Sequence, residues 1–308
     1  MAVTLTQSAL YTQNKLYKGI VDTLIYESPI LGRLPFETMV GNALAINRED
    51  GTAPPSVAWR QVNGVWTEST GDITQVPFTL KILGGDADVD NFLQRTRSDV
   101  TGLMATQVKL KSKAMAREFE DCFIYGVAAG SNQFDGLHTL IPSAQQIHLG
   151  TSTTGAPLTL DVLDQLVDVI RGGKPDMILM NRNVRRRLTA KLRSVGSYTT
   201  ERDAYGNWWV MWNEIPILIS DYIVQTEAID SNVYLSKLNG ATSSVFAVRF
   251  GEGDGMVGIQ NGGIETQVWE KLETKDASRT RIRWYVGVAL YTVQAVACID
   301  GVTDAAMA

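Results

Sequence analysis

Histidine and cysteine are scarce in this chain of 308 residues, which has two of each. His138 and His148 alone are too few for a histidine-rich metal centre, and they disfavour a histidine-based catalytic triad. Cys122 and Cys298 both lie in apolar stretches. We therefore expect two buried free thiols in a reducing compartment rather than a disulfide framework.

Long hydrophobic runs and a basic excess are also lacking. The most apolar run, residues 286–299, is interrupted by Gln294 and is shorter than the ~20 residues that cross a bilayer as a helix. Residues 1–10 lack the basic and apolar regions of a signal peptide. The net charge of -5 disfavours tight coating of nucleic acid. We expect a soluble cytosolic protein with no membrane segment, and 44% hydrophobic residues allow a sizeable core.

Catalytic and nucleotide-binding motifs are missing or lie in the wrong context. Neither Gly-x-Ser-x-Gly nor the phosphate-binding loop pattern occurs. Residues 253–258 do fit Gly-x-Gly-x-x-Gly, which needs a helix opening at its last glycine. Ile259 and then Gly262-Gly263 follow instead, which is typical of strands and turns. We interpret this segment as a hairpin turn.

A calcium-loop pattern starts at Asp86, Asp88 and Asp90 but does not continue. An EF-hand loop needs glycine at its sixth position and glutamate at its twelfth, where this chain has Asn91 and Arg97. We therefore expect a strand that ends at Asp90, with the Asp90 side chain capping a short helix that begins at Asn91.

The most organised stretch is residues 98–137. A long helix is predicted, with Ser98 as N-cap and Gly126 at its end. One apolar face and one charged face predict that this helix lies across a sheet. The apolar positions are Val100, Leu103, Met104, Val108, Met115, Phe119, Cys122 and Phe123, and the charged ones are Lys109, Lys111, Lys113, Arg117, Glu118 and Asp121.

Before this helix, the sequence predicts one helical stretch followed by extended segments. A helical stretch is predicted at 8–26, proline-punctuated chain at 28–36 and strands at 42–48 and 76–82. Asn63-Gly64 lies between two β-rich runs, which is the strongest short hairpin signal. A two-residue turn there would pair Val62 with Val65. It would also put four side chains on one face of the hairpin: Trp59, Gln61, Trp66 and Glu68.

After the helix, helices and strands alternate. Thr159 is predicted to cap one helix, a buried strand follows at 177–180, and a second helix covers 181–195. Strands are predicted at 214–220 and 232–235, with a loop that holds Trp208, Trp209 and Trp212. Further strands at 245–250, 257–260, 266–272 and 280–285 are expected to complete the sheet under the long helix, and 286–299 to return to the second region.

The order of these segments resembles that of tailed-phage major capsid proteins with the Hong Kong 97-type fold. The resemblance is carried by Arg117–Asp121 at the helix end, then Tyr125-Gly126, then Phe134-Asp135-Gly136-Leu137, and it spans roughly residues 28–302. It implies an α+β fold with an N-arm and an E-loop hairpin, a P-domain with a long spine helix on an antiparallel sheet, and an A-domain. The implied bounds are 1–49 for the N-arm, 50–82 for the E-loop, 83–157 and 245–285 for the P-domain, and 158–244 and 286–308 for the A-domain.

The resemblance also implies a structural function without catalytic residues or cofactors. Copies would assemble as hexamers and pentamers into an icosahedral phage head around double-stranded DNA, in the host bacterial cytoplasm. The implied partners are the chain itself, the portal, packaged DNA and, optionally, a cement or decoration protein, with no membrane. Only about two dozen residues precede Ser28, so a separate scaffolding protein is expected. Two alternatives stay open: an encapsulin-like compartment around protein cargo, and an enzyme with an unrecognised site.

Two groups of side chains are candidates for contacts. Trp59, Arg60, Trp66 and Glu68 are expected to touch a neighbouring subunit, with packing on their own subunit as the competing interpretation. Lys109, Lys111 and Lys113 are expected either to make weak non-specific contacts with DNA or to form a solvated face or an intersubunit ion-pair surface. The same interpretations apply to the cluster Arg185-Arg186-Arg187. No lysine lies between Lys18 and Lys81, so the hairpin lacks the nucleophile for the cross-link that some relatives form.

Overall fold

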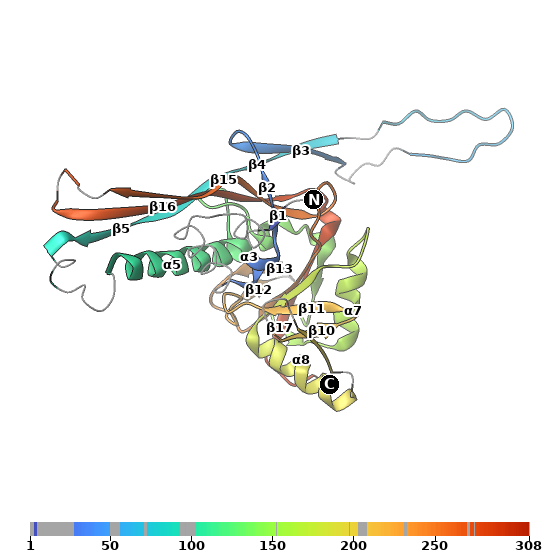
Figure 1. Cartoon of the computed structure of the whole chain (residues 1–308). Coiled ribbons are helices and arrows are strands. Elements are labelled where there is room, and N and C mark those ends of the chain that lie inside the picture. Colours follow the sequence, from blue (N-terminus) through green and yellow to red (C-terminus); the bar gives the residue numbers. More distant parts are fainter. Residues whose placement is uncertain are drawn as a thin grey trace.

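The computed structural model describes residues 3–4, 28–49, 56–70, 73–92, 96, 103–151, 153–196, 198–202, 208–230, 233–269, 272–273 and 275–307. These residues form a five-stranded sheet, an eight-stranded sheet and two two-stranded ribbons. Figure 1 shows the five-stranded sheet as a long upper layer, the eight-stranded sheet below it to one side, and a thin arm that projects away from both.

The upper layer is built around two long strands, β15 (Met256–Trp269) and β16 (Ala277–Leu290), which pair antiparallel. β5 (Lys81–Asp90) pairs antiparallel with the other edge of β16. The far edge of the sheet is formed by β2 (Pro35–Thr38), parallel to β15, and by β1 (Val3–Thr4). The sheet order is therefore β1-β2-β15-β16-β5.

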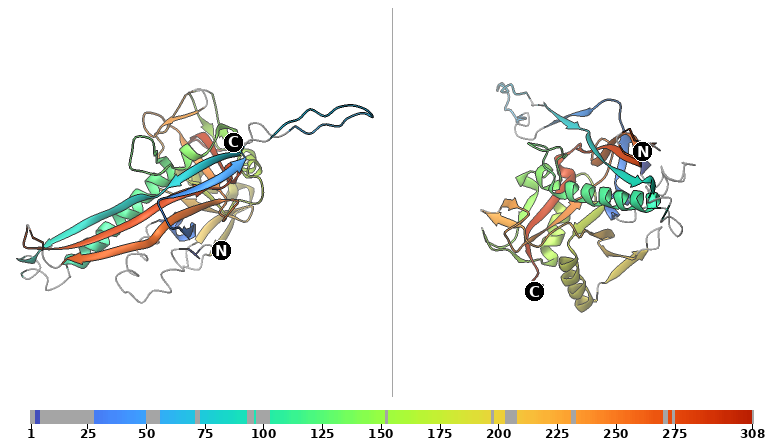
Figure 2. Two further views of the ribbon diagram at one scale, coloured as in Figure 1. Left: turned by 90° about the horizontal axis from the view of Figure 1, so that it is seen from above. Right: turned by 90° about the vertical axis from the view of Figure 1, so that its left-hand side faces the viewer.

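The helix α5 (Leu103–Tyr125) lies along one face of this sheet, as Figures 1 and 2 show. Phe119 is fully buried, and its ring centroid is 5.5 Å from that of Trp284 on β16. The predicted apolar face of the helix is confirmed at Val108, Met115, Phe119, Cys122 and Phe123, which are all buried. The helix ends before Gly126, as expected, whereas the predicted N-cap Ser98 lies outside the described residues.

β15 contains an irregularity opposite a regular partner. Asn261 pairs with Tyr285 and Ile264 with Trp284, so two residues of β15 have no counterpart on β16. These residues are Gly262 and Gly263, with φ of 72° and 76°, a region that other L-residues rarely adopt. Bulges of this kind bend a strand and increase its twist. The long ribbon therefore bends at a position that the two glycines fix.

The eight-stranded sheet is mixed, and it carries the second apolar cluster. Its order is β6-β17-β14-β8-β11-β10-β9, with β7 beside β17. The strands are β6 (Gln146–His148), β7 (Ala156–Pro157), β8 (Met177–Met180), β9 (Thr199–Arg202), β10 (Trp208–Trp212), β11 (Ile215–Ile219), β14 (Ser243–Val248) and β17 (Val296–Thr303). The fully buried β8 and its parallel neighbour β11 form the centre, as predicted from their apolar runs.

Two helices belong to this part of the molecule, α7 (Leu160–Val169) and α8 (Arg182–Val195). The Val162 N–H donates to Thr159 Oγ1 at 3.3 Å, and the Asn183 N–H donates to Asn181 Oδ1 at 2.8 Å. Both predicted helices and the Thr159 cap are thus confirmed, because capping and helical periodicity are local properties of the sequence.

Short elements connect the layers. They are α3 (Pro29–Arg33), α6 (Leu137–Leu140), the 3-10 turns Ser143–Gln145 and Val293–Ala295, the ribbon of β3 (Ala43–Glu49) with β4 (Ile73–Thr79), and the ribbon of β12 (Ala228–Asp230) with β13 (Val233–Ser236). The strand expected within the first segment is β3, and it pairs with β4 at the base of the arm. The helix predicted at 8–26 lies outside the described residues.

Three expectations about strands are wrong. The strand predicted at 245–250 does not join the sheet under α5: it is β14, which lies between β17 and β8. Residues 286–290 belong to β16 and not to a returning strand, which begins only at Val296. Trp208–Trp212 is a strand and not a loop. A short apolar run shows that a strand is buried, but not which of two sheets covers it, and this explains the first error.

Three further expectations are confirmed: the buried thiols, the turn before β15 and the Asp90 cap. Cys122 and Cys298 are buried free thiols. Residues 252–254 form a turn, and the strand β15 follows it rather than a helix. The Phe92 N–H donates to Asp90 Oδ1 at 2.8 Å, which is the predicted cap. No helix in the described part of the chain combines the length and apolar character that a membrane span needs.

Candidate functional site

The arm, residues 56–70, extends from the β3–β4 ribbon away from the rest of the molecule (Figures 1 and 2). Every residue in it is exposed. Its base is tied by the Ser56 and Ser69 hydroxyl oxygens, which lie 3.0 Å apart. The arm has no apolar core of its own, so its apolar side chains are covered by nothing in the described subunit.

The tip of the arm turns one residue earlier than predicted. The Gly64 N–H donates to the Gln61 carbonyl at 3.0 Å, so Val62 and Asn63 are the central residues of the turn. Asn63 has a φ of 64°, which asparagine tolerates better than most residues. The predicted pairing of Val62 with Val65 is therefore wrong, and no strand is formed within 56–70.

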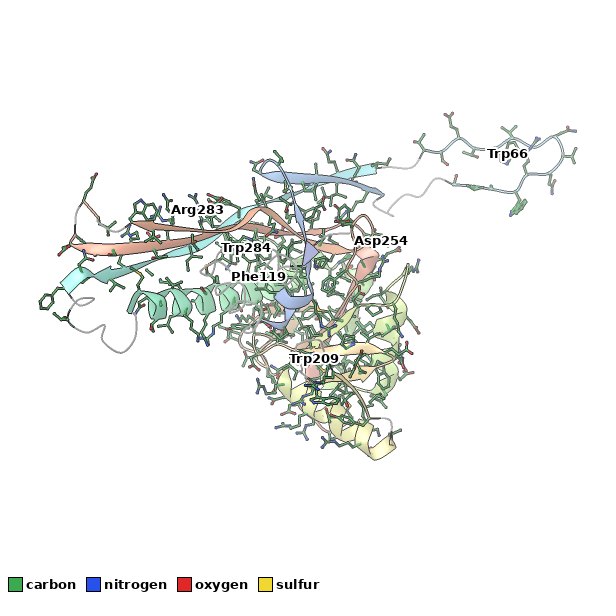
Figure 3. The ribbon with its side chains drawn as sticks, in the orientation of Figure 1. Trp66, Phe119, Trp209, Asp254, Arg283 and Trp284 are labelled. Atoms are coloured by element: carbon green, nitrogen blue, oxygen red, sulfur yellow. The ribbon has the colours of Figure 1, made fainter. Side chains whose placement is uncertain are left out.

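Two tryptophans and an arginine distinguish this arm. The Trp66 indole N–H donates to the Ala58 carbonyl at 3.0 Å, and the Arg60 guanidinium lies 4.3 Å from the Trp66 ring centroid. Arg60 Nη1 also donates to the Gly64 carbonyl at 2.7 Å. The Trp66 ring is therefore held in place, although 61% of the residue is exposed (Figure 3). A fixed and exposed aromatic ring loses little conformational entropy when a partner covers it.

The other apolar side chains of the arm are still more exposed. Trp59 has the exposure of an isolated residue, 104%, and Val57, Val62 and Val65 are all above 90%. Glu68, the fourth predicted contact residue, is also exposed. Isolated exposed apolar residues are ordinary, but a contiguous group on a projecting arm is typical of a surface that binds a partner. Among the residues that the structure describes, none packs against Trp59 or Trp66 from the body of the subunit.

The acidic residues of β5 form ion pairs with β16. Asp86 Oδ1 accepts from Arg281 Nε at 2.7 Å, and Asp88 Oδ1 accepts from Arg279 Nε at 2.6 Å. The hydrogen bond from each arginine lowers the pKa of its aspartate below the ordinary value. The described residues contain no group of three or more potential ligands that could hold a metal. The aspartates that resembled a calcium loop instead join two strands.

The predicted basic face of α5 does not form one site. Lys109 and Lys111 are exposed, whereas Lys113 is half-buried and lines a shallow groove of about 560 Å³. Arg117 and Asp121 line the same groove, so charges of both signs meet there. A contact between these lysines and DNA stays a prediction.

Two arginines of the predicted cluster on α8, Arg186 and Arg187, are engaged within the subunit. Arg187 Nε donates to Asp304 Oδ1 at 2.7 Å, and Arg186 Nη2 lies 3.0 Å from Asp304 Oδ2. The two arginines hold the pKa of Asp304 below its ordinary value. Arg186 and Arg187 are therefore ion-pair partners of the C-terminal strand region, which leaves them less available for a phosphate.

Sequence reasoning missed a buried polar cluster between the end of α5 and the eight-stranded sheet. Glu227 and Asp300 are each 1% exposed, and the Ser244 hydroxyl oxygen lies 2.5 Å from a Glu227 oxygen and 2.9 Å from an Asp300 oxygen. The Tyr125 hydroxyl donates to Glu227, and burial next to that carboxylate raises the Tyr125 pKa. No local pattern marks these residues, because the bonded pairs are separated by between 17 and 102 positions of sequence.

Both histidines lie beside this cluster. The His138 ring stacks on Tyr234 with centroids 3.7 Å apart, and its Nε2 is 3.5 Å from Glu227. His148 Nδ1 is 3.8 Å from Asp300. The arrangement ties the end of α5 to the lower sheet, since Tyr125 belongs to α5 and Asp300 to β17.

Solved structures with the same fold are shells of several kinds. The holo-SrpI encapsulin from Synechococcus elongatus PCC 7942 is 16% identical, with a TM-score of 0.68 over 91% of this chain and 89% of that chain. The capsid of a native GTA particle is 14% identical, with a TM-score of 0.63 over 90% and 91%. The protein of Mycobacterium phage Bobi is 14% identical, with a TM-score of 0.57 over 88% and 89%. At such identities the likeness establishes the fold, and no curated protein matches the sequence.

The sequence itself matches one family model, that of the SU10 major capsid protein, over residues 3–228. The matched part contains the arm, the spine-like helix α5 and most of the eight-stranded sheet. It therefore includes both exposed tryptophans of the arm and the β3–β4 ribbon from which the arm extends, whereas β15 and β16 lie after the matched part. The chain belongs to the SU10 major capsid protein family.

Proposed function

We propose that this major capsid protein assembles as hexamers and pentamers into an icosahedral head around double-stranded DNA, and that the arm holds neighbouring copies together. The observation that carries the proposal is the exposed apolar surface of the arm, which the described subunit leaves uncovered. Family membership and the Hong Kong 97-type fold support a structural role in the capsid of a virion.

The free-energy gain from the arm's contact can be estimated from its two tryptophan rings. If each tryptophan buries about 200 Å² on a neighbour, the gross gain is on the order of 4–5 kcal/mol per ring before ordering costs. Such a gain, repeated at every subunit, favours a closed shell over free subunits. Arg60 and Glu68 supply the polar rim that gives such a contact its specificity.

We propose a division of the chain that follows the sheets. The E-loop is the arm with its β3–β4 ribbon, the P-domain is α5 with the five-stranded sheet, and the A-domain is the eight-stranded sheet with α7 and α8. Compared with the bounds expected from the sequence, β3 moves from the N-arm to the E-loop, and β1 and β2 move from the N-arm to the P-domain. β6, β7 and β14 move from the P-domain to the A-domain. The P-domain also gains residues 81–82 of β5 and residues 286–290 of β16. These assignments rest on which strands pair.

Further partners are part of the same proposal. A phage head needs a portal for DNA entry, and we propose a scaffolding protein during assembly in the host cytoplasm, with a decoration protein as an optional addition. Lys109, Lys111 and Lys113 would make weak non-specific contacts with the packaged DNA. Support for this contact is limited to the exposure of Lys109 and Lys111 on α5.

Negative-stain microscopy of the purified full-length chain tests the main proposal. Shells, capsomers or polymerised tubes are the expected result, and their abundance should rise with protein concentration. A chain that stays strictly monomeric at high concentration, also when it is co-expressed with the neighbouring head genes of its source, would contradict the proposal.

A second candidate is an encapsulin-like compartment, and the fold likeness to the SrpI encapsulin favours it specifically. The content of the particles separates the two functions. Particles purified from the natural source should contain double-stranded DNA and a portal if the chain is a phage head protein, and an enclosed protein cargo without DNA if it forms a compartment.

A further inference from the structure

Glu120 is a buried carboxyl group at the place where three elements meet. It lies on α5, its exposure is 3%, and the hydroxyls of Ser28 and Ser220 act on it. Ser28 precedes α3, and Ser220 directly follows β11; both residues are fully buried. The carboxyl group is therefore enclosed by α5, by the start of α3 and by the end of β11.

The charge around Glu120 does not compensate a carboxylate. The groups that act on its ionisation are the two hydroxyls and the carboxylate of Asp221, and none of them is basic. Arg33, on α3, is directed to the Trp209 ring at 5.9 Å, and Arg182 is paired with Asp221 at 2.6 Å. On α5 itself, the neighbouring Asp121 is paired with Lys237. An ionised carboxyl group that is buried without a cation is costly.

The Ser28 side of this enclosure is the one that can open. α3 has five residues, whereas α5 has 23 and β11 is held between β8 and β10. The buried Ser28 hydroxyl has no hydrogen-bond partner within the described residues, although it lowers the pKa of Glu120 in opposition to burial. Ile30, Leu31 and Leu34 of this segment are fully buried, so displacement of α3 would expose them together with Glu120.

We propose that Glu120 is a proton-dependent latch that holds the segment 28–34 against α5 and β11. When Glu120 is protonated, the segment is closed over it. When Glu120 ionises, water reaches the carboxylate through displacement of α3. The only ligand that this latch binds is a proton. As a consequence, the attachment of the N-terminal part of the chain depends on pH near neutrality.

The sign of the effect follows from the direction of the pKa shift. Burial raises the pKa of Glu120 from 4.5 to about 7, and the hydroxyls of Ser220 and Ser28 only partly oppose this. The stabilisation of the closed segment by Glu120 is complete below the pKa that Glu120 has in the open form. It is lost as pH rises through the pKa that Glu120 has in the closed form. Between pH 6 and pH 8, the opening constant should increase about tenfold.

Hydrogen exchange of the full-length chain tests the latch. The reporter is the Leu34 amide, which donates to the Ile30 carbonyl at 2.9 Å. The protection factor of this amide is corrected for the intrinsic pH dependence of exchange. It should be about tenfold lower at pH 8 than at pH 6, with a transition near pH 7. Equal protection at both pH values in the wild-type chain would overturn the proposal without any variant.

Three variants complete the test. Glu120→Gln keeps the shape of the protonated group and should remove the pH dependence, whereas Glu118→Gln, at an exposed position of the same helix, should retain it. Ser220→Ala removes a hydroxyl that favours ionisation, so the transition should move to higher pH. A Glu120→Gln chain that still shows the wild-type decrease in protection between pH 6 and pH 8 would also overturn the proposal.

Discussion

The arm and the α5 layer use their aromatic residues in opposite ways. In the layer, Trp284 and Phe119 are fully buried and in contact with each other, and the Trp284 indole N–H donates to a Gln260 side chain. In the arm, Trp59 and Trp66 are exposed, and only Trp66 has a hydrogen-bond partner. Figure 3 shows Trp66 on the projecting arm, and Phe119 and Trp284 inside the body of the molecule. The difference indicates that the first pair stabilises the subunit and that the second pair is available to another copy.

The largest expected effect comes from removing both rings of the arm. Trp59→Ala with Trp66→Ala should abolish or strongly reduce shell formation and leave far-UV circular dichroism near native, because the arm contributes nothing to the core. Electron microscopy and circular dichroism measure the two outcomes. The control Trp59→Phe with Trp66→Phe keeps aromatic area and should assemble. Normal assembly of the alanine pair, or its failure to fold, would show that the arm is not an intersubunit element.

A core substitution should have the opposite effect: it should destabilise the subunit itself. Phe119→Ala removes a fully buried ring and should decrease the free energy of unfolding by about 3–5 kcal/mol, measured by denaturant titration. Assembly would then fail only because the subunit is unstable. Leu110→Ala, at an exposed position of the same helix, should change stability by less than about 0.5 kcal/mol. Similar losses in the two variants would contradict the assigned orientation of α5.

A smaller effect is expected from the ion pairs between β5 and β16. Asp86→Asn should decrease stability by no more than about 1 kcal/mol, because the pair is partly solvated. The pKa of Asp86 is lowered by Arg281, so its contribution is present above pH 3.8 and is lost as pH falls through the pKa of the folded form. Thermal melts at pH 6 and pH 3 should differ less in the variant than in the wild type. An unchanged difference would show that the pair has no linkage to folding.

The smallest expected effect is none at all. The described arm has no lysine, so boiled and denatured shells should run as one band near 33.8 kDa. Shells denatured without boiling and shells denatured with boiling should both give this single band. A ladder of multimers would show a covalent bond made by residues other than an arm lysine.

Local signals in the sequence predicted much of this fold. The cap at Thr159, the apolar run 177–180 and the apolar face of α5 depend on neighbours within a few positions, and all are found. Asn63-Gly64 correctly predicted a turn, but the turn type depends on which residue takes the left-handed conformation, and it is Asn63 at the third position of the turn. This shifted the expected pairing in the arm.

Properties that depend on distant contacts were not predictable. β14 is buried on both faces, and only the pairing with β8 and β17 shows to which sheet it belongs. Glu227 and Asp300 meet through Ser244, yet nothing in their local sequence marks them. For the candidate site, the sequence identified the exposed residues of the arm. The contact between the Arg60 guanidinium and the Trp66 ring could be recognised only in the structure.

The bulge at Gly262 and Gly263 has a consequence for the size of a particle. Each of the two paired strands has 14 residues, which corresponds to a length of about 45 Å. Because the bulge bends this ribbon within the chain, every copy brings the same fixed angle to the wall, before any neighbour is added. The shape that each copy brings to a wall of copies therefore depends in part on two glycines.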